Sequence, residues 1–265
     1  MRKPRRAALL ASGNAPECPV LRVLAQAEAI GPVASTSFRV ASRIVNTIRA
    51  GRAVPSFEEF ENCPLILICV PTQSVSPAVA QLAAAPLEWK RHTVILIGSD
   101  ARPLAPLAQL GAVTGLVAAV PGFEERLFVL EAERAALREL RPLLAGRGVQ
   151  IVLLAPGTRA RFDAGVSLAG HVLFPMLAAA GAAFDSTCLP RHLTDSVLEK
   201  TVQRAVRTWL RSRRRGWSAL NGNDIPAQIA ALKEADPLAG AYLQSTVAAG
   251  GHFMRSDGEG LPDQR

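Results

Sequence analysis

Short apolar runs alternate with amphipathic stretches through the first half of the chain. The strongest runs lie at residues 65–70 and 93–97, with others at 6–11, 31–35, 112–120 and 149–154. Apolar runs without internal alternation are typical of strands that helices cover on both faces. Helical patterns separate these runs, at residues 20–29, 41–50, 76–85 and 125–144. The order predicts βαβ units and a parallel sheet.

The pattern changes after Pro156. From residue 158 onward the chain shows only helical patterns, at 160–183, 194–214, 225–234 and 238–250. We therefore expect an α/β domain with a parallel sheet at residues 1–156, followed by an all-helical domain at residues 157–252. The polar residues 253–265 predict a flexible tail.

Composition and charge narrow the class of protein. Of the 265 residues, 49% are hydrophobic and 20% are charged, which is typical of a globular chain. The net charge of +8 includes the basic run 211–215. This run either binds phosphate groups or forms the solvated end of a helix. Because no aromatic ladder or nucleic-acid module accompanies this run, we disfavour a nucleic-acid binder.

The four cysteines form no Cys-x-x-Cys pair, and with the histidines they show no metal-ligand spacing. We therefore predict no metal site and a reducing, cytoplasmic location. Residues 164–184 are as long as a membrane span and contain only His171 as an ionisable residue. Their glycines and alanines equally suit a helix buried in a dimer. Without a second span, we expect no membrane and a homodimer formed through the helical domain.

The loop after the first expected strand carries part of a phosphate-binding pattern. A Gly-x-Gly-x-x-Gly loop needs its glycines for a tight turn, for backbone contact with pyrophosphate and for close helix packing. Residues 11–16 read Ala-Ser-Gly-Asn-Ala-Pro, so only the middle glycine remains. Since helix amides at such a turn bind phosphate, we expect Ser12, Gly13 and Asn14 to contact a dinucleotide. Pro16 adds bulk, and the interpretation requires that it does not fill the hollow above Gly13.

The loop after the second expected strand offers hydroxyl groups and an arginine. An acidic residue at this place binds the ribose of NAD, whereas Ser37 and Arg39 suit the 2′-phosphate of NADP. We therefore expect NADP as the cofactor, with NAD as the alternative. The other interpretation is an ordinary polar loop in a chain that binds neither cofactor.

Further candidates follow the next strands. Val70, Pro71 and Thr72 close the central strand and would lie beside the nicotinamide. Ser99 and Asp100 follow the strand at residues 93–97 and are expected to line a substrate cleft.

One expected helix carries the candidate acid–base residues. Asp163, Ser167 and His171 follow one another at helical spacing and share one stripe of the helix. A histidine here can protonate a forming alkoxide or amine, with Asp163 as its partner. The alternative is a structural histidine, with Asp163 favoured only by the helix dipole.

These parts, in this order, resemble a family of Rossmann-like oxidoreductases whose helical C-terminal domain has no assigned function. This family is related to pyrroline-5-carboxylate reductase and to the 6-phosphogluconate dehydrogenase superfamily. The resemblance covers nearly the whole chain and rests on shared segments, listed here in order: Leu67-Ile68-Cys69-Val70-Pro71, Leu104-Ala105-Pro106-Leu107, Gly111-Ala112, Phe162, and Ile229, Leu232, Pro237, Ala239 and Tyr242. It implies a Rossmann-type domain, a nicotinamide cofactor and a small-molecule substrate.

Several polar positions depart from that family. Asp163 stands where relatives carry histidine, and His171 stands where they carry asparagine. Ala118 and Ala119 replace a His-Pro pair. Loss of several polar residues from one cleft fits either a shifted substrate or a chain that is no longer an enzyme.

The sequence favours an NAD(P)-dependent oxidoreductase that acts on a small carbonyl or imine. The alternative is a non-catalytic dimeric binding or scaffold protein that keeps this fold without a working cofactor site.

Overall fold

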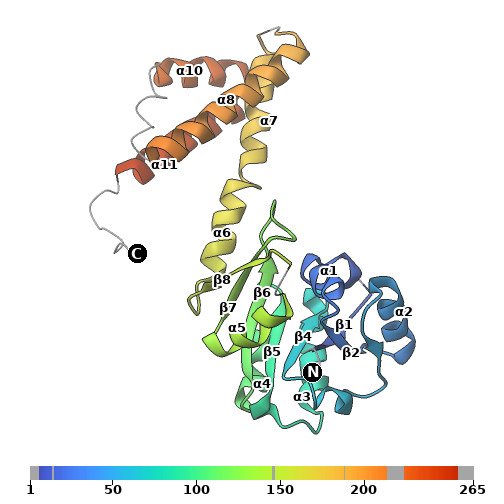
Figure 1. Cartoon of the computed structure of the whole chain (residues 1–265). Helices are drawn as coiled ribbons and strands as arrows, with labels where there is room; N and C mark the ends of the chain where they lie inside the picture. Colours follow the sequence, from blue (N-terminus) through green and yellow to red (C-terminus); the bar gives the residue numbers. More distant parts are fainter. Residues whose placement is uncertain (1–5, 14, 145–146, 188, 214–223, 256–265) are drawn as a thin grey trace. The chain divides into compact units, whose positions relative to one another are not determined.

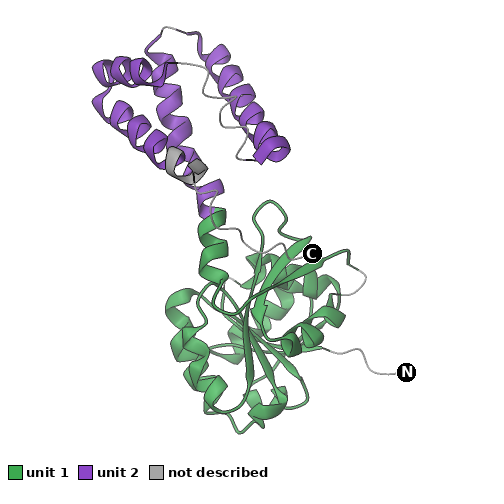
Figure 2. Ribbon diagram, turned by 90° about the vertical axis from the view of Figure 1, so that its left-hand side faces the viewer, with its two compact units in different colours: residues 1–166 green, residues 167–265 purple. Residues whose placement is uncertain are grey.

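The computed structural model describes residues 6–13, 15–144, 147–187, 189–213 and 224–255. The chain divides into two compact units, Met1–Val166 and Ser167–Arg265 (Figure 2). The division falls inside helix α6 (Arg159–Ala169), beyond the expected boundary at Pro156.

The first unit is built on an eight-stranded sheet with the strand order β3-β2-β1-β4-β5-β6-β7-β8 (Figure 1). Its strands are β1 (Ala7–Ala11), β2 (Ile30–Ala34), β3 (Arg52–Ala53), β4 (Leu65–Cys69), β5 (Thr93–Ile97), β6 (Val113–Ala119), β7 (Leu127–Ala132) and β8 (Gln150–Leu154). All neighbouring pairs are parallel except β6 and β7. The order of the first six strands is that of a Rossmann-type sheet, which confirms the predicted fold class.

Helices cover both faces of this sheet. Leu9, Leu67 and Ile95 pack against α1 (Pro19–Gln26), α2 (Phe38–Ile48) and α5 (Arg134–Leu140). On the other face, Leu10 and Ile66 pack against α3 (Val75–Ala83) and α4 (Ala105–Gln109). Because successive strand residues point to opposite faces, apolar strands of this kind supply both layers of the core.

The helix expected over residues 125–144 is wrong in its first half. Strand β7 occupies Leu127–Ala132 and pairs antiparallel with β6, and only the short helix α5 follows. The residues after the strand are rich in Ala, Arg and Glu, which favour helices, and the predicted helix was therefore extended over the strand as well. Gly115 permits the pairing, because a Cβ atom there would lie 2.5 Å from the Cβ of Ala132.

The second unit contains α7 (Leu173–Asp185), α8 (Arg191–Ser212), α10 (Ile225–Ala235) and α11 (Pro237–Arg255). The single helix expected over residues 160–183 is interrupted between Ala169 and Leu173, where α6 ends and α7 begins. All other helices expected here are confirmed. The remainder of the expected tail, residues 256–265, lies outside the described part.

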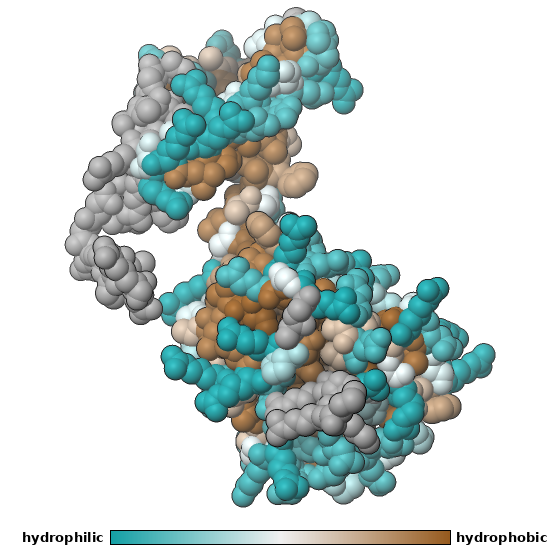
Figure 3. All heavy atoms as spheres, viewed as in Figure 1, coloured by the Kyte–Doolittle hydropathy of each residue, from teal (hydrophilic) through white to brown (hydrophobic). Residues whose placement is uncertain are grey.

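Few side chains are buried within the second unit. Among its described residues only Thr194, Ala239 and Gly240 are buried, while Phe174 is 75% exposed and Leu238 is 83% exposed. Figure 3 shows apolar residues gathered on the visible face of its helices. By length and composition alone, the helical stretch Arg159–Asp185 could cross a membrane, and none of its apolar window is buried within the chain. Apolar surfaces of this kind are typical of faces that another molecule covers.

A carboxylate of the sheet holds the start of α6. Glu131 on β7 accepts hydrogen bonds from the backbone N–H groups of Gly157 and Arg159, the latter at 2.9 Å. Free N–H groups at a helix start are otherwise unsatisfied, and a carboxylate suits the positive end of the helix dipole. Glu131 therefore connects the sheet to the helix that leads out of the unit.

We expect Glu131→Ala to speed amide hydrogen exchange at Gly157 and Arg159 by about tenfold, since losing such a cap costs about 1–2 kcal/mol. Glu133→Ala is the matched control, because Glu133 is exposed and its side chain makes no hydrogen bond to a described residue. Equal exchange rates in both variants would show that Glu131 does not hold the helix.

Candidate functional site

The carboxyl ends of β1 and β4 form the centre of the candidate site. These strands are neighbours, with Ala11 opposite Cys69, and the sheet continues to β2 on one side and to β5 on the other. The backbone N–H of Ser12 donates to the carbonyl oxygen of Cys69 at 3.1 Å. The loops after both strands therefore start side by side at the point where the strand order reverses, which is where such sheets bind ligands.

The backbone at Gly13 is open. Its φ lies outside the left-handed region, and a Cβ atom built there would have no heavy atom within 4 Å. Neither backbone strain nor packing against the described chain therefore requires glycine at this position. Pro16 lines a separate hollow together with Arg22 and Thr47, of α1 and α2. The open backbone leaves room for a ligand to approach it closely.

The hydroxyl oxygen of Ser12 is buried and has no hydrogen-bond partner among the described residues. Buried hydroxyl groups in folded proteins are nearly always paired, with protein or with another molecule. An unsatisfied hydroxyl beside an open glycine is compatible with a phosphate oxygen as its partner. The residue that follows Gly13, Asn14, lies outside the described residues.

Helix α1 offers fewer free amides to an anion than the sequence pattern led us to expect. A short 3₁₀ turn, Ala15–Glu17, precedes the helix, and Pro16 and Pro19 have no N–H. The N–H of Ala15 donates to the carbonyl of Ser12 at 2.9 Å. Backbone contact with a phosphate would therefore depend mainly on the loop around Gly13.

The two candidates after β2 have different environments. Ser37 caps α2, since its hydroxyl accepts the N–H of Val40 at 3.3 Å. Arg39, in the first turn of the same helix, is exposed and pairs with no other described residue. Leu10 lies opposite Ala34 at the ends of β1 and β2, so this loop opens at the same sheet edge as Gly13. Arg39 is thus available to an anionic ligand.

Candidates after the later strands also lie at this edge. Val70 and Pro71 are half-buried and lead into the exposed Thr72. Ser99 is exposed beyond β5. The carboxylate of Asp100 instead accepts hydrogen bonds from the Nε and Nη2 of Arg102, at 3.0 and 2.8 Å. This arginine lowers the pKa of Asp100, so the carboxylate stays charged and is already partnered.

The predicted acid–base residues are not joined by hydrogen bonds within the described chain. Asp163 on α6 accepts the Nε of Arg159 at 2.8 Å, and the Arg159 side chain is only 7% exposed. Ser167 follows one turn later on α6. His171 is exposed in the turn beyond the end of that helix. Asp163 is therefore the partner of Arg159, and His171 is free to meet a ligand.

The structure brings together two cysteines that the sequence analysis treated separately. Cys69, at the end of β4, and Cys18, at the N-cap position of α1, both pack against the same core cluster. Interaction with Cys69 is the largest cause that lowers the pKa of Cys18 to about 7, with further lowering contributions from the N–H groups of Leu21 and Val20. Contact with Cys18 and burial raise the pKa of Cys69.

We expect the alkylation rate of Cys18 by iodoacetamide to reach half its maximum at about pH 7. Cys69→Ala should move this midpoint upward, because it removes the neighbour that contributes most to the lowered pKa of Cys18. Cys63, which is buried, is the internal control and should remain unlabelled. An unchanged midpoint in the variant would contradict the contact.

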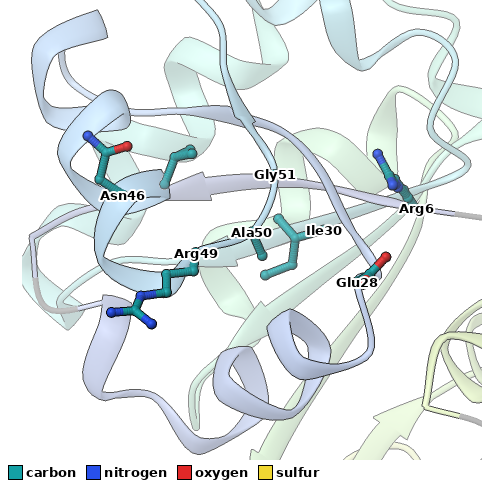
Figure 4. Close-up of a pocket in the computed structure, with 8 residues that line it drawn as sticks. Arg6, Glu28, Ile30, Asn46, Arg49, Ala50 and Gly51 are labelled. Carbon is teal, nitrogen blue, oxygen red and sulfur yellow. The ribbon is translucent and has the colours of Figure 1, made fainter.

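A separate hollow of about 470 Å³ lies at the other ends of the strands, away from their carboxyl ends (Figure 4). Arg6, Glu28 and Arg49 line it, near the start of β2 and the end of α2. Because ligands of such sheets bind at the carboxyl ends of the strands, we do not assign this hollow to the candidate site.

The first unit is therefore of the Rossmann type, with an open glycine loop at the point where the strand order reverses. A helical unit follows it in the sequence. No family model matches the sequence, and no curated protein matches it either.

Solved structures with this fold are known. A protein named "putative NADP oxidoreductase" from Bacteroides fragilis has a TM-score of 0.71 and 10% identity, over 95% of this chain and 99% of that one. An imine reductase variant from Myxococcus stipitatus in complex with NAD⁺ has a TM-score of 0.65 and 16% identity, over 93% and 94%. Pyrroline-5-carboxylate reductase from Coxiella burnetii has a TM-score of 0.56 and 14% identity, over 94% and 98%. At these identities the likeness shows the fold.

Proposed function

We propose that this chain is an NAD(P)-dependent oxidoreductase that reduces a small carbonyl or imine. The observation that carries the proposal is the open backbone of Gly13 beside the end of β4. A pyrophosphate would lie against this loop, with the unpaired hydroxyl of Ser12 as a donor. The names of the structural neighbours, which include an NADP oxidoreductase and an imine reductase with NAD⁺, support this class of reaction.

The remaining contacts would be shared between two loops. Arg39 would bind the 2′-phosphate of NADP as an exposed, unpaired cation, while Ser37 holds the start of its helix. Val70, Pro71 and Thr72 would form the wall beside the nicotinamide. The bound cofactor would supply the hydride, and the protein would supply orientation and a proton.

His171 is our proposed proton donor, because its side chain is exposed and is not partnered by Asp163. A histidine can exchange a proton near neutral pH. Asp163 would act as a charged group that Arg159 positions, with Ser167 as a polar neighbour on the same helix. Ser99 and Asp100 would line the substrate side of the site.

Calorimetric titration with NADPH and NADH tests the cofactor assignment. We expect saturable binding of NADPH in the micromolar range and weaker binding of NADH. Binding of neither cofactor at millimolar concentration would remove the oxidoreductase proposal.

A second candidate function is a non-catalytic binding protein with the same fold. The two prolines that remove amides near α1 favour it, as does the engagement of Asp163 by Arg159. This function predicts cofactor binding without turnover, or no binding, when a panel of small ketones and cyclic imines is assayed with NADPH. Measurable turnover that His171→Ala removes would decide for the enzyme.

We also propose a cytoplasmic homodimer formed through the helical unit. An apolar groove of about 320 Å³ runs between α7, α10 and α11, lined by Met176, Phe184, Leu232 and Leu243. A second copy could cover it together with the exposed Phe174.

Sedimentation at micromolar concentration should show twice the 28.1 kDa chain mass. Phe174→Glu should yield monomers, whereas the control Thr201→Glu on the exposed face of α8 should not; a monomeric wild type contradicts the proposal.

A further inference from the structure

A hydroxyl group at the end of β2 reaches across to the start of the candidate site. Ser35 is the first residue after β2, and its Oγ donates a hydrogen bond to the carbonyl oxygen of Ala11 at 2.6 Å. Ala11 is the last residue of β1. The bond is partly buried, where the lower local dielectric constant makes a hydrogen bond stronger than at the surface. The side chain of Ser35 is therefore engaged by the protein itself.

The peptide bond between Ala11 and Ser12 is held from both sides. Its carbonyl oxygen accepts the Ser35 hydroxyl, and its N–H donates to the carbonyl oxygen of Cys69 at 3.1 Å. These partners come from the ends of β2 and β4, the two strands that flank β1 in the sheet. Because a peptide unit is planar, bonds to its oxygen and to its hydrogen together fix its orientation. The chain therefore enters the loop at Gly13 in a fixed direction.

This fixed peptide precedes the two loop features that a ligand can use. The buried hydroxyl of Ser12 has no partner among the described residues, and the Cβ position of Gly13 is open. Rotation of the peptide before Ser12 would move both of them. A loop that is already held in its binding conformation loses less conformational entropy when a ligand binds, and this raises the affinity.

We infer that Ser35 is a positioning residue of the dinucleotide site: its hydroxyl fixes the peptide between Ala11 and Ser12, so that Ser12 and the backbone of Gly13 are presented to the pyrophosphate. The effect on cofactor affinity rests on the proposed function, whereas the fixing of the loop does not. Ser35 lies at the strand end where an acidic residue would bind the ribose of NAD, but its hydroxyl is bonded to β1 instead. Contact with the 2′-phosphate is left to Arg39.

A positioning role and direct contact with the cofactor have different consequences. The pyrophosphate is common to NADPH and NADH, so loss of a group that positions its loop lowers the affinity for both cofactors equally. Loss of a group that binds the 2′-phosphate lowers the affinity for NADPH alone. The ratio of the two dissociation constants in Ser35→Ala therefore distinguishes the two roles.

The first test is amide hydrogen exchange of the full chain without a cofactor, read at the bonded N–H groups of Ser12 and Ala15. We expect Ser35→Ala to speed exchange at Ser12 by about three- to tenfold, because one neutral hydrogen bond is lost. Ser35→Thr keeps the hydroxyl and should exchange as the wild type does. Thr47→Val is the matched control, since it removes another hydroxyl that donates to a backbone carbonyl of the same unit. Unchanged exchange in Ser35→Ala would overturn the inference.

The second test is calorimetric titration of the same proteins with NADPH and with NADH. Ser35→Ala should lower both affinities by the same factor, about three- to tenfold, and Ser35→Thr should restore both. A loss confined to NADPH, or wild-type affinities in Ser35→Ala, would overturn the positioning role. A wild-type chain that binds neither cofactor, together with faster exchange at Ser12 in Ser35→Ala, would refute the proposed function and leave the fixing of the loop intact.

Discussion

Replacing Gly13 with aspartate lowers the affinity for NADPH by about 100-fold or more, and leaves the fold intact. A carboxylate close to the pyrophosphate would oppose its negative charge by about 4 kcal/mol at 4 Å and an effective dielectric constant of 20. The fold should tolerate the side chain because no heavy atom lies within 4 Å of the Cβ position. Calorimetric titration of both proteins measures the effect, and circular dichroism checks the fold.

Ala80→Asp is the matched control for this variant. Ala80 is exposed on α3, so the substitution adds the same charge at another surface position of the same unit. We expect the control to bind NADPH as the wild type does. Equal affinities in all three proteins would place the pyrophosphate elsewhere.

Replacing Arg39 with alanine lowers the affinity for NADPH by about 10- to 100-fold, because a hydrogen bond to a charged group contributes about 1.5–3 kcal/mol. NADH affinity should remain unchanged, since NADH lacks the 2′-phosphate that Arg39 would bind. The ratio of the two dissociation constants is therefore the measurement that isolates this contact.

Arg43→Ala controls for the loss of one positive charge from α2. Arg43 is exposed one helical turn beyond Arg39, and its side chain forms no ion pair with a described residue. We expect its cofactor preference to match that of the wild type. If both variants lower the affinities for NADPH and NADH equally, the arginines contribute only a general positive potential. The preference for NADP then has another origin.

The sheet could be predicted from the sequence wherever the apolar runs were short and bounded by glycine or proline. Strands β4 and β5 were clear because Leu65 through Ile68 and Thr93 through Ile97 are nearly all apolar. Strand β7 was missed because its Leu-Phe-Val-Leu run continues directly into a helix former-rich segment, with no turn signal between them. Its antiparallel pairing depends on Gly115, a long-range contact that local patterns do not contain.

The location of the candidate site could be predicted from the sequence better than the interactions of its side chains. Strand ends at the switch point located Gly13, Val70 and Arg39 from sequence order alone. The ion pairs of Asp163 with Arg159 and of Asp100 with Arg102 were not part of the sequence prediction. The position of Cys69 opposite Ala11 depends on strand register, which the sequence pattern does not specify.

A crystal structure of the chain with NADP⁺ tests the central claim most directly. The account predicts the pyrophosphate against the backbone of Gly13, within hydrogen-bond distance of the Ser12 hydroxyl, and the 2′-phosphate beside Arg39. A cofactor bound at the opposite edge of the sheet, near Arg6 and Arg49, or a loop closed over Gly13 with no cofactor bound, would contradict it.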